Sequence, residues 1–349
     1  MMHNLFSHWQ QANNNWLQID TLDMHTGGEP LRIIVDGFAQ LAGHTMLEKR
    51  ADCLARFDHL RQALMFEPRG HADMYGALIT EPERAESHFG VLFLHNEGYS
   101  TMCGHAIIAL ATAAKECAVT KFNEGINELR IDTPAGLIKA YLTLKNNQLT
   151  QVCFDNVASF VDRLALQITV PKYGHISCDI AFGGAYYAFV DADSIDLQLT
   201  PNNHDKIITL GKAIKAQVAR QYQPTHPVDD ALGFLYGVIF YSNTQLSNHD
   251  AFSRHVCIFA AGELDRSPTG TGVSARAALA FAKGELKIGQ QVNIESILGS
   301  VFSVELQQQY PFSGYTATVP RVSGTAYVTG THRFIIDPAD PLQQGFIFR

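Results

Sequence analysis

In two segments of the chain, a residue with a sulfur or oxygen atom in its side chain stands directly before a glycine. In both segments that glycine begins an alanine-rich stretch. In the first segment, Cys103 precedes Gly104 and His105. A cysteine at the start of a helix lies beside unpaired backbone N–H groups and the positive end of the helix dipole, which stabilise a thiolate. Because a thiolate can act as a general base or a nucleophile, Cys103 is the first catalytic candidate.

In the second segment, Thr269 precedes Gly270 and Thr271. A threonine hydroxyl does not ionise near neutral pH and can only donate or accept a hydrogen bond. Threonine is also a favoured N-cap residue, so we expect Thr269 both to cap its helix and to line a cleft. Asp265 stands four residues earlier. It is either a ligand for an ammonium or imino group or a solvated loop carboxylate, and the sequence leaves both open.

The two helix starts together predict a receptor for one small carboxylate. Backbone N–H groups at a helix start bind anions, and Gly104 and Gly270 allow a ligand to approach the backbone closely. Nucleotide binding is not favoured, because residues 270–275 match a dinucleotide-binding glycine motif only in part. Ala275 occupies the position of the third glycine of that motif.

Two helices of unusual composition must position these side chains. Residues 104–117 and 270–283 are rich in alanine and nearly free of charge, which is typical of helices buried on every side. Residues 48–65 and 203–221 predict amphipathic helices. Alternating or β-branched runs predict strands over residues 31–35, 90–94, 129–132, 137–144, 151–154, 180–190, 234–241, 255–259, 291–296, 302–306 and 315–319.

The two alanine-rich helices align with each other at an offset of 269 − 103 = 166 residues. At this offset Gly104 matches Gly270, and alanines at 109, 111 and 114 match alanines at 275, 277 and 280. A Gly-Gly pair precedes each helix, at 27–28 and at 183–184. The repeat predicts two similar mixed α/β domains, with both helix starts facing a cleft between them.

The composition limits the class of protein. A chain of 349 residues that is 46% hydrophobic and 17% charged has enough apolar material for two domains. A net charge of −8 and the lack of a basic cluster disfavour a nucleic-acid partner. The longest strongly apolar stretch, residues 231–241, is too short to span a membrane. Residues 1–15 show no basic and apolar signal pattern, so we expect no secretory signal.

Five further cysteines are interpreted as small buried hydrophobic residues. They are Cys53, Cys117, Cys153, Cys178 and Cys257. No two cysteines form a Cys-x-x-Cys pair, and a chain of this length does not need disulfides for stability. We therefore expect reduced thiols and a cytoplasmic location.

The sequence resembles the proline racemase family. The resemblance rests on Met102-Cys103-Gly104-His105 and on residues 265–272, Asp-Arg-Ser-Pro-Thr-Gly-Thr-Gly. Residues 23–30, 67–76 and 323–327 support it. The resemblance implies a mixed α/β (α+β) fold of the diaminopimelate-epimerase type, in which two pseudo-symmetric domains each wrap strands around a central helix. It implies a first domain of residues 16–165 with 328–349, a second of residues 166–327, and a homodimer.

The resemblance also implies an activity. Racemases and epimerases of the family use two cysteines, one on each face of the substrate, whereas this chain has Cys103 and Thr269. That pairing resembles the trans-3-hydroxy-L-proline dehydratases of the family, which form Δ1-pyrroline-2-carboxylate without a metal or cofactor. Cys103 would then remove the α-proton of the imino acid. The implied substrate-binding residues are Gly104, His105, Asp265, Gly270 and Thr271.

Several alternatives stay open at this point. Hydroxyproline 2-epimerase or proline racemase is the alternative within the family, and a non-catalytic imino-acid binder is another. A non-haem iron oxygenase is the distant alternative, because His71 and Asp73 have the spacing of part of its iron site; otherwise they are polar loop or supporting residues. Glu29 and Arg69 are interpreted as structural. The sequence offers His105, Thr269 or a bound water as the group that protonates the departing hydroxyl.

Overall fold

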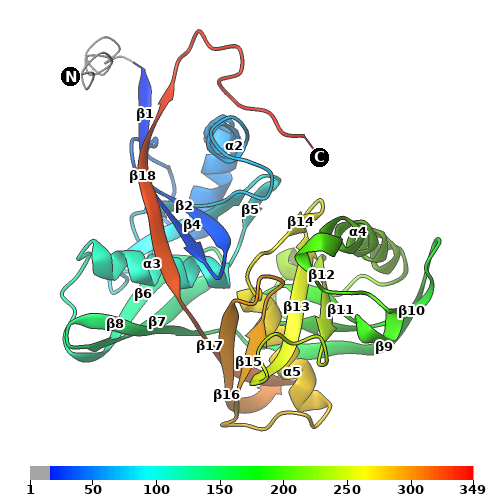
Figure 1. The fold of residues 1–349 in the computed structure, drawn as a ribbon. Helices are drawn as coiled ribbons and strands as arrows, with labels where there is room; N and C mark the ends of the chain where they lie inside the picture. The colour runs from blue at the N-terminus through cyan, green and yellow to red at the C-terminus, as the bar shows by residue number, and fades with distance from the viewer. Residues whose placement is uncertain (1–15, 349) are drawn as a thin grey trace, which may run out of the picture.

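The computed structural model describes residues 16–348 as a mixed α/β fold in which long strands surround two buried helices (Figure 1). Residues 1–15, where the sequence predicts no secretory signal, lie outside the described residues. The first elements are β1 (Leu17–Thr26), β2 (Glu29–Asp36), α2 (Met46–Met65), β3 (Tyr75–Thr80), β4 (Phe89–His95), β5 (Gly98–Ser100), α3 (Gly104–Glu116), β6 (Gly125–Thr133), β7 (Gly136–Lys145) and β8 (Gln148–Asp155).

The remaining elements begin with the strands β9 (Phe160–Val170), β10 (Gly174–Phe182) and β11 (Tyr186–Asp191). They continue with η1 (Asp193–Ile195), η2 (Pro201–Asn203), α4 (His204–Gln221), η3 (Asp230–Leu232), β12 (Leu235–Ser242), β13 (Ala251–Phe259), β14 (Glu263–Leu264), α5 (Gly270–Ala282) and β15 (Gln291–Glu295). The last strands are β16 (Val301–Phe312), β17 (Tyr315–Gly324) and β18 (Ala326–Ile336).

The strands form two series with the same order of pairing. The first series is β18-β1-β2-β3-β4-β6-β7-β8, and the second is β9-β10-β11-β12-β13-β15-β16-β17. In each series the third and fourth strands pair in parallel, and so do the fifth and sixth. The central helices α3 and α5 hold equivalent places. This correspondence supports the predicted repeat and brings Cys103 and Thr269 to equivalent positions.

The chain joins the two series where it runs from β17 of the second into β18 of the first, and one strand pairing, between β8 and β17, also joins them. β18 returns from the end of the chain to pair with β1 from Leu17↔Ile336 to Thr26↔Ala326, as the red and blue strands of Figure 1 show. β8 pairs with β17 from Asp155↔Arg321 onwards.

The predicted domain division stays a prediction. Its two boundaries, after residue 165 and after residue 327, fall within β9 and β18, whereas the pairings favour boundaries before each of these strands.

The central helices are buried because most of their side chains are small or apolar. Every residue of α3 from Gly104 to Ala114, and of α5 from Gly270 to Ala280, is buried. Alanine keeps each helix thin, so strands can pack on all its sides. One apolar cluster contains residues of both helices, which means that the two halves share a continuous core.

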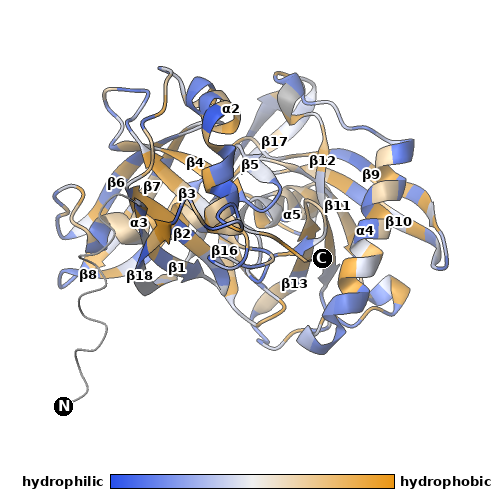
Figure 2. Cartoon of the chain, turned by 90° about the horizontal axis from the view of Figure 1, so that it is seen from above, coloured by the Kyte–Doolittle hydropathy of each residue, from blue (hydrophilic) through white to orange (hydrophobic). Residues whose placement is uncertain are grey.

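The other two helices lie on the outside of the strand layers. Apolar residues of α4 recur at helical spacing, namely Ile207, Leu210, Ile214 and Val218, and face the core. Figure 2 shows the resulting mixture of polar and apolar residues along α4. α2 begins with a capping box, in which the Thr45 side chain and the Glu48 side chain each accept from the other residue's backbone N–H.

The mixed α/β prediction is confirmed, and all four expected helices form within about two residues of their expected ends. The expected strand over residues 180–190 is wrong as a single strand. It consists of the end of β10 and of β11, because the Gly183-Gly184 turn separates them and Gly184 has a φ of +105°. The predicted strand ranges do not include β1, β3, β5, β9, β14 or β18.

The two helix starts contact each other at their glycines, and this contact generates a prediction. A Cβ atom on Gly104 would lie 2.7 Å from the Cα of Gly270 and 3.0 Å from the Phe154 ring. We expect Gly104→Ala to lower the free energy of unfolding by about 1–3 kcal/mol, because backbone cannot move aside as a side chain can. Thermal unfolding measures this effect. Gly330→Ala in β18 is the control, since its Cβ would meet nothing closer than 3.5 Å. Equal melting temperatures for the two variants would contradict the contact.

Candidate active site

Cys103 and Thr269 are the N-cap residues of α3 and α5, and both line one small cavity between the helix starts. The cavity volume is about 30 Å³, which is room for about two water molecules. The first half contributes Tyr75, Met102, Cys103, Gly104 and His105, and the second contributes Tyr187, Tyr236, Cys257, Phe259, Asp265, Thr269, Gly270 and Thr271. The structure thus brings all seven predicted site residues together.

Backbone N–H groups of both helices are available at this cavity. The first bond within α3 runs from the N–H of Ile107 to the carbonyl of Cys103 over 3.1 Å, and within α5 from Val273 to Thr269 over 2.8 Å. The N–H groups before these residues therefore have no acceptor inside their helices. Neither N-cap side chain caps its helix. The expectation that the Thr269 hydroxyl caps α5 is wrong, because that hydroxyl donates a hydrogen bond to the Asp265 carboxylate instead.

The Cys103 thiol lies beside an imidazole that can accept its proton. The Cys103 Sγ is 3.1 Å from Nδ1 of His105. The His105 ring also donates a hydrogen bond to the Pro30 carbonyl. A carbonyl can only accept, so the proton of the neutral ring is on that side and Nδ1 carries the free lone pair. Cys103 and His105 thus form a thiol–imidazole pair.

The protonation of Cys103 differs from the sequence expectation. Burial raises the pKa of the Cys103 thiol far above its ordinary value, and the carboxylates of Asp265 and Glu29 raise it further. Hydrogen bonds from the Ala106 N–H and from the Tyr75 hydroxyl lower the pKa of the thiol, but by less. In this closed cavity, desolvation of the thiolate outweighs the effect of the helix start. Burial also lowers the pKa of His105, so this ring is neutral at pH 7.

Thr269 is held in an unusual backbone conformation by the loop that contains Asp265. Its φ is +69°, which is rare for a β-branched residue. The Thr269 hydroxyl donates to Oδ2 of Asp265 over 2.8 Å, and its N–H donates to the Ser267 hydroxyl over 3.1 Å. The N–H of Ser267 donates to Oδ1 of Asp265 over 2.8 Å. Asp265 is therefore a buried carboxylate of the cavity, and the solvated-loop interpretation is wrong.

The turn between β1 and β2 ties this loop to the first half. The Arg266 N–H donates to Oε2 of Glu29 over 2.7 Å, and the Arg266 guanidinium pairs with Asp73 at 2.9 Å. The Ser300 hydroxyl donates to the Gly27 carbonyl over 2.6 Å. Burial, with the nearby Asp265 charge, raises the pKa of Glu29 well above its ordinary value. Glu29 and Asp73 therefore help to join the two cavity walls in this closed arrangement.

The other two uncertain residues lie away from the cavity. Arg69 donates to the carbonyls of Gln343 and Ile335, so it fastens the end of the chain, in agreement with its structural interpretation. His71 is exposed. Among residues 16–348 no three His, Cys, Asp or Glu side chains are grouped as metal ligands. The iron-site alternative is therefore wrong for His71 and Asp73 in the described part of the chain.

Sequence reasoning missed the aromatic walls of the cavity. The Tyr187 hydroxyl is 2.6 Å from the Thr271 hydroxyl oxygen, and the Tyr236 ring stacks on Phe259 with centroids 5.6 Å apart. Tyr75 packs edge-on against His105, with centroids 4.9 Å apart. These residues lie on β3, β11, β12 and β13, and only pairing of the strands shows that they meet at one place. The sequence gives no local signal for that.

One of the five remaining cysteines differs from its interpretation, and another lines the cavity. Cys117 is exposed after the end of α3, so its prediction as a buried residue is wrong. Cys257 is buried as predicted but lines the cavity on the Thr269 side. The Thr269 hydroxyl lies close enough to lower the pKa of Cys257, although burial raises that pKa much more. Cys257 therefore holds its proton at neutral pH.

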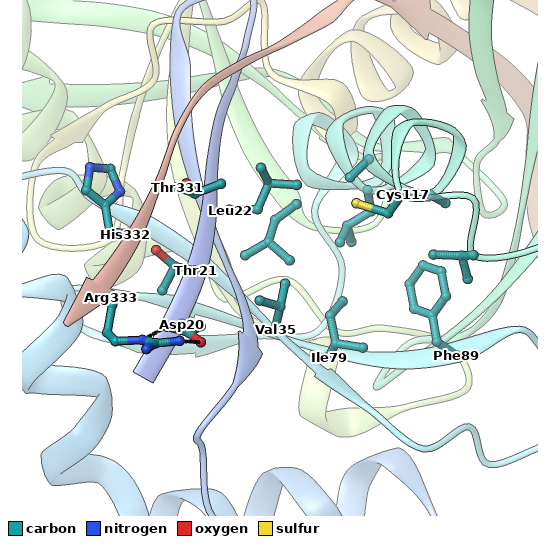
Figure 3. Close-up of a pocket in the computed structure, with 15 residues that line it drawn as sticks. Asp20, Thr21, Leu22, Val35, Ile79, Phe89, Cys117, Thr331, His332 and Arg333 are labelled. Carbon is teal, nitrogen blue, oxygen red and sulfur yellow. Dashed lines mark hydrogen bonds and ion pairs between the residues drawn. The ribbon is translucent and has the colours of Figure 1, made fainter. Parts of the chain in front are cut away.

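A much larger cavity, of about 750 Å³, lies elsewhere, between β1, β2, β18 and the end of α3 (Figure 3). Its walls are mainly apolar, with Leu22, Val35, Ile79 and Phe89 pointing into it. The Asp20–Arg333 ion pair lies at its rim. Despite its size, this cavity holds no buried base beside a helix start, so the small cavity is the better candidate active site.

No described helix is both long and apolar enough to cross a membrane.

Curated proteins resemble this chain over almost its whole length. A protein of Colwellia psychrerythraea named trans-3-hydroxy-L-proline dehydratase is 49% identical over 99% of this chain and 97% of its own. Proteins of the same name from Bacillus cereus and Homo sapiens are 43% and 40% identical, over 94% and 95% of this chain and 97% and 95% of their own.

Solved structures agree. A hydroxyproline epimerase from Agrobacterium vitis, with bound trans-4-hydroxy-L-proline, superposes with a TM-score of 0.86 at 29% identity, over 95% of this chain and 96% of its own. A probable proline racemase from Agrobacterium radiobacter has the same TM-score and identity, over 94% of this chain and 96% of its own. The predicted fold class is thereby confirmed. A family profile described as proline racemase matches residues 21–347, and the chain belongs to the proline racemase family.

Proposed function

We propose that this protein dehydrates trans-3-hydroxy-L-proline to Δ1-pyrroline-2-carboxylate. The single observation that carries the proposal is the pairing of Cys103 with Thr269 at facing helix starts in one closed cavity. A thiol on one side and a hydroxyl that cannot ionise on the other suit removal of one proton without its return to the opposite face. The names of three similar curated relatives support this substrate.

The substrate carboxylate binds to the backbone N–H groups of Gly104, His105, Gly270 and Thr271, where helix starts favour an anion. Asp265 accepts from the ring ammonium group. Aromatic walls surround the pyrrolidine ring. Because the cavity holds only about two water molecules in its closed form, the two halves must separate to admit the ring and close again over it. Closure then excludes water from the developing carbanion.

His105 and the substrate make Cys103 a base. Nδ1 of His105 accepts the thiol proton over the 3.1 Å contact, and the resulting imidazolium stabilises the thiolate. The bound ammonium group adds a positive charge beside Asp265. The thiolate then removes the α-proton, and the helix-start N–H groups stabilise the negative charge that develops on the carboxylate. Departure of the 3-hydroxyl gives an enamine, which tautomerises to the cyclic imine.

We also propose that the chain works in the cytoplasm as a homodimer. All six cysteines are free thiols, including the exposed Cys117, which suits a reducing compartment. Among residues 16–348, β18 pairs on one side only, with β1, and it exposes Tyr327 and Val328. Such an edge favours contact with a second copy. Light scattering of the purified protein tests the oligomeric state, and a monomer would contradict this part of the proposal.

We expect Cys103→Ser to lose at least about 10²-fold in kcat, because a serine hydroxyl beside a neutral imidazole is a far weaker base than a thiolate. Product formation from trans-3-hydroxy-L-proline measures this loss. Cys117→Ser is the matched control, since that thiol is exposed outside the cavity. If Cys103→Ser dehydrates as fast as the control, the base has been assigned to the wrong residue.

We expect Thr269→Cys to gain epimerisation of trans-4-hydroxy-L-proline at C2. The new thiol would stand at the second helix start and could return a proton to the opposite face. Chiral chromatography detects the epimer. Thr269→Ser serves as control and should yield no epimer. A folded Thr269→Cys variant that forms no epimer would show that residue 269 does not face the α-carbon.

The thiol–imidazole pair predicts a specific dependence on pH. His105 has a lowered pKa, so its ring takes up a proton from solution only below the ordinary histidine pKa of about 6.5. A ring that is already protonated cannot accept the Cys103 thiol proton, and the pair is then inactive. We expect kcat/KM to be level from about pH 7 to 9 and to fall at lower pH. In His105→Gln the thiol proton has no acceptor, so kcat/KM should rise throughout that range as the thiol with its raised pKa ionises. A wild-type profile that rises in the same way would contradict the pair.

A further inference from the structure

The stereochemistry of the substrate decides where the departing hydroxyl lies. In the trans isomer, the 3-hydroxyl and the carboxylate are on opposite faces of the ring. The α-hydrogen is also on the face opposite the carboxylate, so the hydrogen and the hydroxyl leave from the same face. On the proposed function, which this inference requires, Cys103 removes the α-hydrogen. The group that protonates the departing oxygen must therefore reach the Cys103 face of the ring.

The cavity offers few groups on that face. The residues from the half that contains Cys103 with a transferable proton are Tyr75, Cys103 and His105. Both nitrogens of the His105 ring are already engaged, one with Cys103 and the other with the Pro30 carbonyl. Cys103 itself receives the α-hydrogen. Thr269 belongs to the other helix start and faces the opposite side of the ring, which leaves the Tyr75 hydroxyl.

Tyr75 is fixed in position by its neighbours. It opens β3 and is 3% exposed, and its ring packs against His95, with centroids 5.8 Å apart, and against His105, with centroids 4.9 Å apart. Its hydroxyl oxygen is 2.5 Å from that of Ser100. It also interacts with Cys103, since each of the two side chains shifts the pKa of the other. Tyr75 thus touches the base and retains its own proton at neutral pH, because burial raises its pKa.

We propose that Tyr75 is a catalytic residue that binds the 3-hydroxyl of the substrate and supplies the proton with which it departs as water. The Cys103 thiolate takes the α-hydrogen as a proton, and the electron pair of the C–H bond forms the C2–C3 double bond. The C3–O bond breaks with its electron pair on oxygen, which takes the Tyr75 proton. The Cys103 thiol then returns the former α-proton to Tyr75. The product water carries away the proton that Tyr75 donated, the former α-proton stays on Tyr75, and both side chains regain their starting states.

The test uses Tyr75→Phe, which removes one oxygen atom and keeps the ring that packs on His95 and His105. Tyr99→Phe is the matched control, because its hydroxyl donates to Cys53 outside the cavity. Each protein is incubated with trans-3-hydroxy-L-proline in deuterated water. Product formation measures elimination, and α-deuterium in recovered substrate measures proton removal by Cys103. We expect Tyr75→Phe to slow elimination by about 10²-fold and to raise the ratio of deuterium exchange to elimination.

The other outcomes are distinguishable. If Tyr75→Phe eliminates at the rate of Tyr99→Phe, the proton comes from another group and the inference is wrong. If exchange and elimination fall together in a folded Tyr75→Phe variant, Tyr75 acts only on Cys103 and is not the acid. If Cys103→Ser retains both exchange and elimination, the proposed function of Cys103 fails instead.

A second substrate tests the same-face geometry independently. In cis-3-hydroxy-L-proline the hydroxyl lies on the carboxylate face, away from Tyr75. We expect the wild-type protein to exchange the α-hydrogen of this isomer in deuterated water but not to dehydrate it. Dehydration of the cis isomer at a rate similar to the trans isomer would overturn the assignment of Tyr75.

Discussion

The contact between two helix N-termini at Gly104 and Gly270 is the constraint on which the rest of this structure depends. Each helix is buried to its first residue, and only glycine allows the two backbones to approach so closely. The approach aims two sets of unpaired N–H groups at one small volume. It also places one N-cap side chain from each half in that volume. The carboxylate receptor and the catalytic pair are thus consequences of the same packing.

The close packing of the helix starts disfavours ionisation of the catalytic thiol. A thiol buried this deeply, with Asp265 and Glu29 nearby, does not ionise readily, in spite of the helix start. The imidazole of His105 and the hydroxyl of Tyr75 are the compensating groups, since one accepts the thiol proton and the other interacts favourably with a thiolate. Glu29 and Asp73 of the first half both bind Arg266 of the second and so join the walls. Activity on this account develops only when a substrate completes the charge balance of the closed cavity.

The sequence could predict the parts of the site that depend on short motifs of consecutive residues. Cys103, Thr269 and the glycines after them are recognisable because a helix start needs particular residue types at adjacent positions. The alanine-rich helices are predictable for the same reason. Tyr75, Tyr236 and Phe259 were missed because each is an ordinary strand residue, and only long-range pairing brings their strand ends together. The ionisation of Cys103 was misjudged because desolvation depends on the whole fold and not on local sequence.

The most direct measurement of the central claim, one-sided proton removal, is incubation of the wild-type protein with L-proline in deuterated water. L-Proline has no leaving group, so proton removal and return are all that can be seen. The account predicts that deuterium enters the α-position of L-proline while no D-proline accumulates. Accumulation of D-proline would show an effective acid on the Thr269 side and would contradict the account.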